Sequence, residues 1–331
     1  ISKYIEYWLI SIFLVISIMI VVGGLTRLTD SGLSITQWQL FSGIIPPLNI
    51  DQWNHYFTLY KKIPEYKIQN YSMTLDEFKV IFWWEFIHRL LGRLIGVLFL
   101  IPLIFFTIKI GFKRTINFHI IFLLICLQGF IGWYMVSSGL VNRVDVSHYR
   151  LALHLVLAFI ILSLIFWNYL NYKGIKLPNK KINSFLPLTF IILLFIQLIV
   201  GALVSGMDAG KIYNTWPLMG KSYFPDDNFI INLFNFSSLN DPSLVQFIHR
   251  NLAYLIMVFY LFILVKIFRN KLSYYFTTMY VIGCLLTLQI LLGIFTLLSG
   301  AQIFISSMHQ ISSIFLISSG VYFLFLNTKT N

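Results

Sequence analysis

The chain has 331 residues, of which 58% are hydrophobic and only 11% are charged, and its formal net charge is +12. Soluble domains carry about 25% charged residues, so this composition excludes an ordinary soluble protein. The basic residues lie at the ends of apolar runs, which indicates membrane topology and argues against a nucleic-acid partner.

Apolar runs recur along the whole sequence, and each is long enough to cross a bilayer, which takes about 20 residues in a helix. The first run continues to a full span without a cleavage pattern, so we expect no cleavable signal peptide. The sequence predicts an all-α polytopic membrane protein with transmembrane helices at residues 8–26, 81–108, 116–136, 151–170, 184–205, 244–266, 273–298 and 303–326.

Lysine and arginine concentrate at the chain ends and in the short connections on the same side as the N-terminus, whereas nearly all acidic residues lie on the other side. The positive-inside rule then places both termini in the cytoplasm or its equivalent. The two long connections, residues 27–80 and 206–243, would lie outside and form ordered caps.

Three sequence elements recur in the same order. FIHR at residues 86–89 returns at 247–250, and LQ followed by glycine at 127–132 returns at 288–293. GGL at 23–25 returns as GAL at 201–203. We therefore predict two parallel four-helix repeats, related by an axis along the membrane normal. The domains would be residues 1–172 and 173–331.

Four histidines, one in each even-numbered span, would lie at a common depth roughly 10 Å below the outer surface. They form two pairs, His88 with His154 and His249 with His309. Three interpretations are open: hydrogen-bonded core histidines, a zinc site, and axial ligands of heme iron. Zinc needs three or four converging ligands, and two facing imidazoles suit a flat macrocycle better. Glycines on spans two, three and seven (Gly92, Gly96, Gly129, Gly132, Gly293 and Gly300) fit either close helix packing or a heme site.

The two repeats differ beside these histidines. Glu85 stands three residues before His88, whereas Gln246 stands three before His249. Residues three apart share a helical face, so only the first site would hold an acid suited to proton transfer. The alternative is that Glu85 only neutralises Arg89, four residues on. Arg89 and Arg250 occupy equivalent positions and could face anionic heme propionates.

Taken together, these residues resemble the heme A synthase family, in its proteobacterial and mitochondrial branch, over nearly the whole chain. The matching segments are GGLTRLTDSGLSITQW at 23–38, PEY at 64–66, WWEFIHRLLGR at 83–93, LQGFIGWYMVSSGL at 127–140, NTWPLM at 214–219, QFIHR at 246–250 and MHQ at 308–310. One departure is that both cysteines, Cys126 and Cys284, lie in apolar runs, so the loop cysteine pairs of some bacterial members are missing.

The resemblance implies an enzyme that oxidises a ring methyl group of heme O to the formyl group of heme A, for cytochrome c oxidase. It implies that His249 and His309 bind a heme b cofactor and that His88 and His154 bind the heme O substrate. Glu85 would be the required acid, and Arg89 and Arg250 would assist at the two hemes.

Expected partners are the lipid bilayer, heme O synthase and oxidase assembly factors, while the electron partner and homo-oligomerisation are left open. A two-heme b electron-transfer cytochrome explains the four histidines but leaves the Glu85/Gln246 difference unexplained. A transporter built from parallel repeats also remains an alternative, and it would bind no heme.

Overall fold

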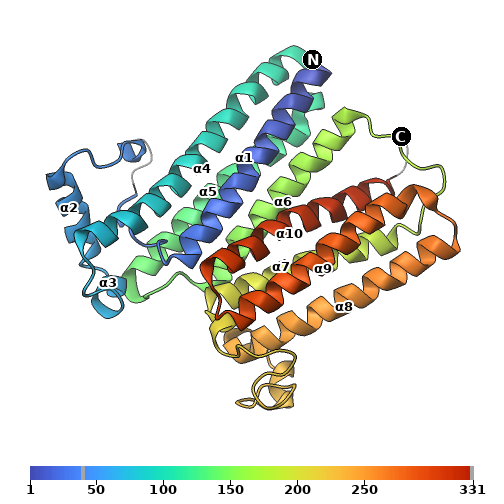
Figure 1. The fold of residues 1–331 in the computed structure, drawn as a ribbon. Helices are drawn as coiled ribbons and strands as arrows, with labels where there is room; N and C mark the ends of the chain where they lie inside the picture. Colours follow the sequence, from blue (N-terminus) through green and yellow to red (C-terminus); the bar gives the residue numbers. More distant parts are fainter. Residues whose placement is uncertain (39–41, 329–331) are drawn as a thin grey trace. The chain divides into compact units, whose positions relative to one another are not determined.

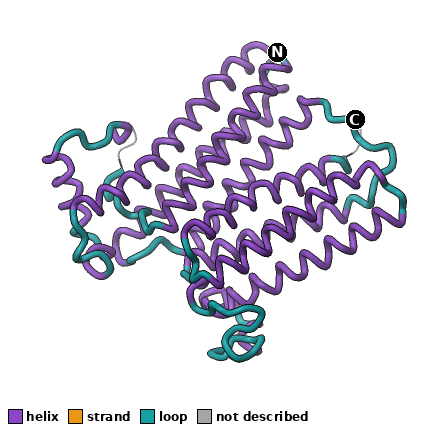
Figure 2. The backbone as a smooth tube through the Cα atoms, in the orientation of Figure 1, coloured by secondary structure: helices purple, strands orange, loops and turns teal. Residues whose placement is uncertain are grey.

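Helices dominate the computed structural model, which describes residues 1–38 and 42–328, and no strand occurs in those residues (Figures 1 and 2). Within them, eight helices are long and apolar enough to cross a membrane. They are α1 (Ser2–Leu28), α4 (Leu75–Ile110), α5 (Phe112–Asn142), α6 (His148–Lys173), α7 (Phe185–Gly206), α8 (Pro242–Arg269), α9 (Phe276–Leu298) and α10 (Ile303–Phe325). The predicted all-α polytopic membrane protein is confirmed.

Several helices begin before the apolar run that predicted them, because a polar cap starts the helix outside the hydrocarbon segment. The Thr74 hydroxyl accepts from the Glu77 backbone N–H, and the Glu77 carboxylate accepts from the Thr74 N–H. This capping box starts α4 six residues before the predicted position. Similarly, Asp241 caps α8 by accepting from the Leu244 N–H.

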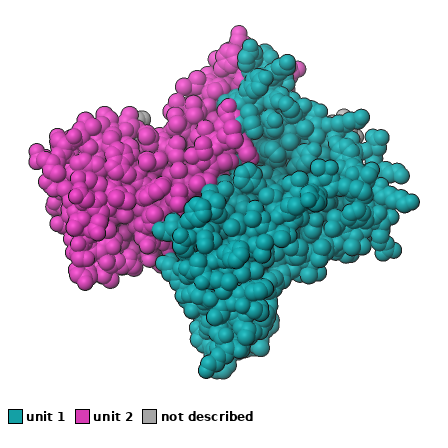
Figure 3. Space-filling model, in the orientation of Figure 1, with its two compact units in different colours: residues 1–10, 162–331 teal, residues 11–161 magenta. Residues whose placement is uncertain are grey.

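The chain forms two compact units, residues 11–161 and residues 1–10 with 162–331 (Figure 3). The unit boundaries fall inside α1 and α6. Residues 1–10 of α1 and the part of α6 from residue 162 onward therefore belong to the same unit as the C-terminal residues. These are the two helix ends predicted to face the cytoplasm. The division into residues 1–172 and 173–331, and the parallel relation of the repeats, stay predictions.

In the unit of residues 11–161, α4 packs on α5, and the first long connection packs on both. That connection contains η1 (Ser42–Ile44), α2 (Ile50–Tyr60) and α3 (Pro64–Ile68). Aromatic rings join it to the start of α4: Phe57 stacks on Phe78 with ring centroids 5.1 Å apart, and Trp53 meets Phe82 edge-on at 5.0 Å. Such buried aromatic pairs hold the connection in a fixed shape.

In the other unit, α7 packs on α8 and on α10, and α9 packs on α10. The second long connection contains three short helical turns, η2 (Ala209–Lys211), η3 (Ile230–Phe234) and η4 (Phe236–Asn240). A further turn, η5 (Ser273–Tyr275), precedes α9.

Candidate functional site

The four membrane histidines come together in two pairs of nearly the same geometry. The ring centroids of His88 on α4 and His154 on α6 lie 6.4 Å apart, with ring planes at 69°. Those of His249 on α8 and His309 on α10 also lie 6.4 Å apart, with planes at 80°. Each pair lies within one compact unit.

Each imidazole ring lies directly against a glycine of a neighbouring helix. A Cβ on Gly132 of α5 would come within 3.0 Å of the His154 ring, and one on Gly23 of α1 within 2.9 Å of His88. In the other unit, Cβ atoms on the two corresponding glycines, Gly201 and Gly293, would each lie 3.0 Å from a histidine ring. The missing side chains are therefore what lets the rings fit between the helices.

Glutamine amides fix the backbone beside three of the four histidines. The Gln128 side chain donates to the His154 carbonyl at 2.9 Å. Gln197 and Gln289 donate to the carbonyls of His249 and His309, each at 3.0 Å. A helical carbonyl already accepts from within its helix, so these extra bonds tie neighbouring helices together at the height of the rings.

The pairs suit a metal ion held between two imidazoles. An ion bound by both Nε2 atoms at about 2 Å would place the ring centres roughly 6 Å apart. The Nδ1 atoms of His154, His249 and His309 are buried and have no hydrogen-bond partner among the described residues. All four histidines are partly exposed as residues. The Nε2 atoms of His249 and His309 lie 3.4 and 3.5 Å from the amide nitrogens of Gln197 and Gln289, which an ion bound there would displace. Within the described part of the chain, no three histidine, cysteine or acidic side chains converge, which disfavours a zinc site.

Glu85 is buried beside the first pair, and both of its carboxylate oxygens accept hydrogen bonds. One oxygen, Oε2, accepts from the Ser34 hydroxyl and the Ile35 N–H, both at 2.7 Å. The other, Oε1, accepts from Arg89 Nε at 3.0 Å and Nη2 at 2.6 Å. The pairing with Arg89 that the sequence offered as an alternative is thus present. It fixes the orientation of the acid, which stands one helical turn before His88 on α4.

Arg89 also joins α4 to the segment that follows α1. Its guanidinium donates to the carbonyls of Ile35 at 2.8 Å and Gln37 at 3.3 Å, and it lies over the Trp38 ring, 5.4 Å from the centroid. A guanidinium has five N–H donors, and Arg89 makes four hydrogen bonds to protein groups. Most of its donors are therefore already used within the protein, and its contact with a heme propionate stays a prediction.

Beside the second pair the polarity is reversed. The Gln246 side-chain amide donates to the Tyr213 carbonyl of the second long connection at 3.1 Å. Glu85, in contrast, accepts hydrogen bonds from Ser34 and Ile35 of the first long connection. Arg250 donates to the carbonyls of Tyr213 at 3.0 Å, Thr215 at 3.0 Å and Leu218 at 3.3 Å. Arg89 and Arg250 are thus alike, because each donates hydrogen bonds to a long connection. Glu85 and Gln246 differ both in charge and in whether the side chain accepts or donates the hydrogen bond.

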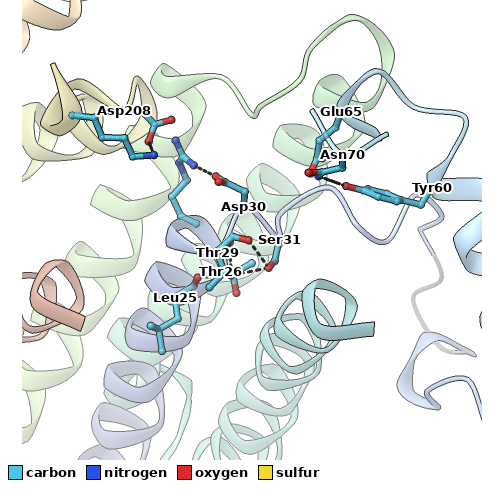
Figure 4. A network of polar contacts seen from close by, with 11 residues as sticks. Leu25, Thr26, Thr29, Asp30, Ser31, Tyr60, Glu65, Asn70 and Asp208 are labelled. Atoms are coloured by element: carbon cyan, nitrogen blue, oxygen red, sulfur yellow. Dashed lines mark hydrogen bonds and ion pairs between the residues drawn. The ribbon is translucent and has the colours of Figure 1, made fainter. Parts of the chain in front are cut away.

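A further buried acid, Glu65, was not singled out as a site residue from the sequence, where it appears only within the PEY segment. Its Oε1 accepts from the Tyr60 hydroxyl at 3.0 Å, and Asn70 donates to the same hydroxyl at 2.8 Å (Figure 4). Only 3% of Glu65 is exposed. An acid in a loop is usually solvated, so the sequence carried no signal for this burial.

Within the described residues, eight helices able to cross a membrane and two matching histidine pairs define an integral membrane protein. The chain belongs to the cytochrome oxidase assembly protein family, whose family model matches residues 6–321.

A curated relative from Pelagibacter ubique (strain HTCC1062), named heme A synthase, is 50% identical over 99% of this chain and 97% of its own. One of the same name from Rickettsia bellii (strain RML369-C) is 43% identical over 96% of each chain. A third, from Rickettsia prowazekii (strain Madrid E), is 40% identical over 99% of each. The predicted resemblance and its proteobacterial branch are confirmed.

Proposed function

We propose that this protein is a heme A synthase, an oxidoreductase that converts a ring methyl group of heme O into the formyl group of heme A. Family membership and relatives of that name along the full chain support this. The observation that carries it is the difference between two otherwise matching sites. The two histidine pairs share one separation, and among the described residues a buried carboxylate, Glu85, stands one helical turn from a histidine of the first pair, where the second has Gln246.

We assign His88 and His154 to the iron of the heme O substrate, and His249 and His309 to the iron of a heme b cofactor. A bound heme b supplies one-electron chemistry, with a potential set by its two histidine ligands. Buried, hydrogen-bonded Gln246 leaves no titratable group three residues before His249, which suits a site that only holds and passes electrons. Arg89 and Arg250 fasten the connection beside each site.

Glu85 is the group we assign to proton transfer. Oxidation of a methyl group releases protons as well as electrons, and a general base must lie within hydrogen-bond reach of the proton that it takes. Three residues before His88, Glu85 lies on the same helical face. Ser34, Ile35 and Arg89 fix its carboxylate in place, and one of these hydrogen bonds has to be given up when the carboxylate takes a proton.

The test is Glu85→Gln, which places at the first site the residue found at the second. We expect both hemes to remain bound and the yield of heme A to fall by about 100-fold or more, the usual contribution of a general base. Chromatography of hemes extracted from the purified protein measures the yield, and the absorption spectrum measures occupancy. Unchanged conversion by this variant would remove Glu85 from the mechanism.

A two-heme b electron-transfer cytochrome is the second candidate, favoured by the equal 6.4 Å ring separations. Extraction distinguishes the two functions, because this cytochrome would yield heme b alone even when heme O is supplied.

For the cellular setting, we propose a bacterial inner membrane with both termini cytoplasmic, based on the distribution of lysine and arginine. Heme O synthase and oxidase assembly factors are the partners we propose.

A further inference from the structure

The connection between α7 and α8 displays a cluster of large apolar side chains that nothing in the described structure covers. Phe234 is 81% exposed and Phe236 is 83% exposed. We call the cluster the apolar lobe; it consists of Phe229, Ile230, Ile231, Phe234 and Phe236. These residues lie on and beside two consecutive short turns, η3 and η4. Exposed apolar side chains gathered in this way mark a contact surface.

The base of the apolar lobe is firmly tied down. Asp227 accepts from the Ser243 hydroxyl at 2.7 Å and from the Tyr213 hydroxyl at 3.0 Å. Asn228 donates to Asp241, which also caps α8. These bonds hold the pKa of Asp227 below its ordinary value although partial burial opposes this. The lobe is therefore presented in a set orientation by a structured base.

The position of the apolar lobe in the chain places it near the lipid boundary. Asp241 caps α8 directly after η4, so the lobe lies at the level where a membrane helix begins. In Figure 1 the segment that carries the lobe projects from the start of α8, on the side away from α9. Along α8, exposed apolar residues such as Leu255, Val258 and Phe262 face outward, and in a membrane these contact lipid.

The chemistry of the lobe favours lipid chains over a charged partner. No lysine or arginine occurs between Lys221 and Arg250, and the acids of the base are bonded internally. Phenylalanine and isoleucine gain free energy by leaving water for the boundary between headgroups and acyl chains. Basic residues would be expected if the lobe recognised anionic headgroups.

We propose that the apolar lobe inserts into the lipid boundary at the membrane face where α8 begins. The same connection supplies the carbonyls of Tyr213, Thr215 and Leu218 that bind Arg250. Insertion therefore anchors to the bilayer the segment that lies beside the His249–His309 pair. This inference is independent of the reaction assigned to the protein.

The experiment uses the full chain in phosphatidylcholine vesicles, with Cys126 and Cys284 replaced by alanine. A single cysteine introduced as Phe234→Cys carries an environment-sensitive fluorophore. The matched control is Lys221→Cys, an exposed position before the base of the same connection. We expect blue-shifted emission at position 234 and several-fold stronger quenching by lipids with a nitroxide near the headgroup. The control should be quenched by aqueous iodide instead.

Two results would overturn the proposal. If iodide quenches position 234 as strongly as position 221, the lobe lies in water. If the emission at 234 is blue-shifted but insensitive to nitroxide lipids, and changes with the protein-to-lipid ratio, the lobe contacts a second copy of the chain. The heme absorption spectrum of each labelled variant checks that the protein is folded, and Phe236→Cys gives an independent reading.

Discussion

At the scale of single residues, each histidine depends on a glycine that makes room for its ring. The sequence places glycines on the odd-numbered helices, yet it does not say which of them meets a histidine. In α5, Gly132 lies against His154, whereas nothing lies within 4 Å of a Cβ built on Gly129. Two glycines three residues apart on one helix therefore have different roles.

The change Gly132→Ala should displace the His154 ring, because its Cβ would lie 3.0 Å from a ring carbon. We expect about tenfold weaker binding of heme O, equivalent to about 1.4 kcal/mol, measured by absorption titration of the purified protein. The control Gly129→Ala adds the same methyl group to the same helix and should bind heme O normally. Equal effects of the two changes would mean that the glycines act only through helix propensity or flexibility.

At the scale of secondary-structure elements, α2 and α3 are joined by a buried acid. Glu65 of α3 accepts from Tyr60 at the end of α2, and its second oxygen, Oε2, is buried without a hydrogen-bond partner among the described residues. Burial raises the pKa of Glu65 to about 8, and the carboxylates of Glu85, Asp145 and Asp30 add to the rise, while the Tyr60 hydrogen bond opposes it. The acid therefore holds its proton near neutral pH.

This raised pKa predicts that the first connection loosens as the pH rises from 4.5 to about 8. Its ordinary value is 4.5, so between pH 4.5 and 8 the opened form releases a proton that the closed form keeps. Stability therefore falls as pH rises through this window, by about 1.4 kcal/mol per pH unit, and the loss is complete above pH 8.

Hydrogen exchange of residues 50–70 between pH 6 and 9, corrected for the intrinsic rate, measures this opening. Glu65→Gln keeps an acceptor for Tyr60 but cannot ionise, so protection in this variant should not change with pH. If the two proteins lose protection in parallel, Glu65 is not the titrating group.

The sequence predicted these elements unevenly, for physical reasons. Long apolar runs must form helices in lipid because every backbone group has to be bonded internally, so all eight spans were predictable. Helix starts were missed where polar caps extend the helix, as at Thr74, although the capping box is itself readable. The connection helices α2 and α3 were not predicted, because their formation depends on packing, of α2 against α4 and of α3 against α5.

The residue types of the candidate site could be predicted from the sequence, whereas the hydrogen-bond partners of Glu85 could not. Spacing brought His88, Glu85 and Arg89 to one side of a helix, since residues three or four apart face the same way. Ser34 and Ile35, which donate hydrogen bonds to Glu85, lie about 50 residues before it in the sequence. A left-handed turn at Asp30, with φ of 48°, comes just before them. No local pattern predicts that they meet Glu85.

At the scale of the whole molecule, the two units carry matching histidine pairs and opposite polar partners. In one, the connection presents donors, the Ser34 hydroxyl and the Ile35 N–H, to an acidic acceptor. In the other, the Tyr213 carbonyl is an acceptor and faces the amide donor of Gln246. The difference between the sites therefore lies in the connections as well as in the residues at 85 and 246.

It follows that exchanging the two side chains should not exchange the two sites. In Gln246→Glu the new carboxylate would face the Tyr213 carbonyl, two acceptors without a proton between them, so we expect weakened binding of heme b and no new activity. The double change Glu85→Gln with Gln246→Glu should remain inactive, as measured by heme A yield and heme b content. Recovery of activity in the double variant would show that the acid alone defines the reacting site. Without recovery, reversal would also need the backbone and hydroxyl donors that the first connection brings to Glu85.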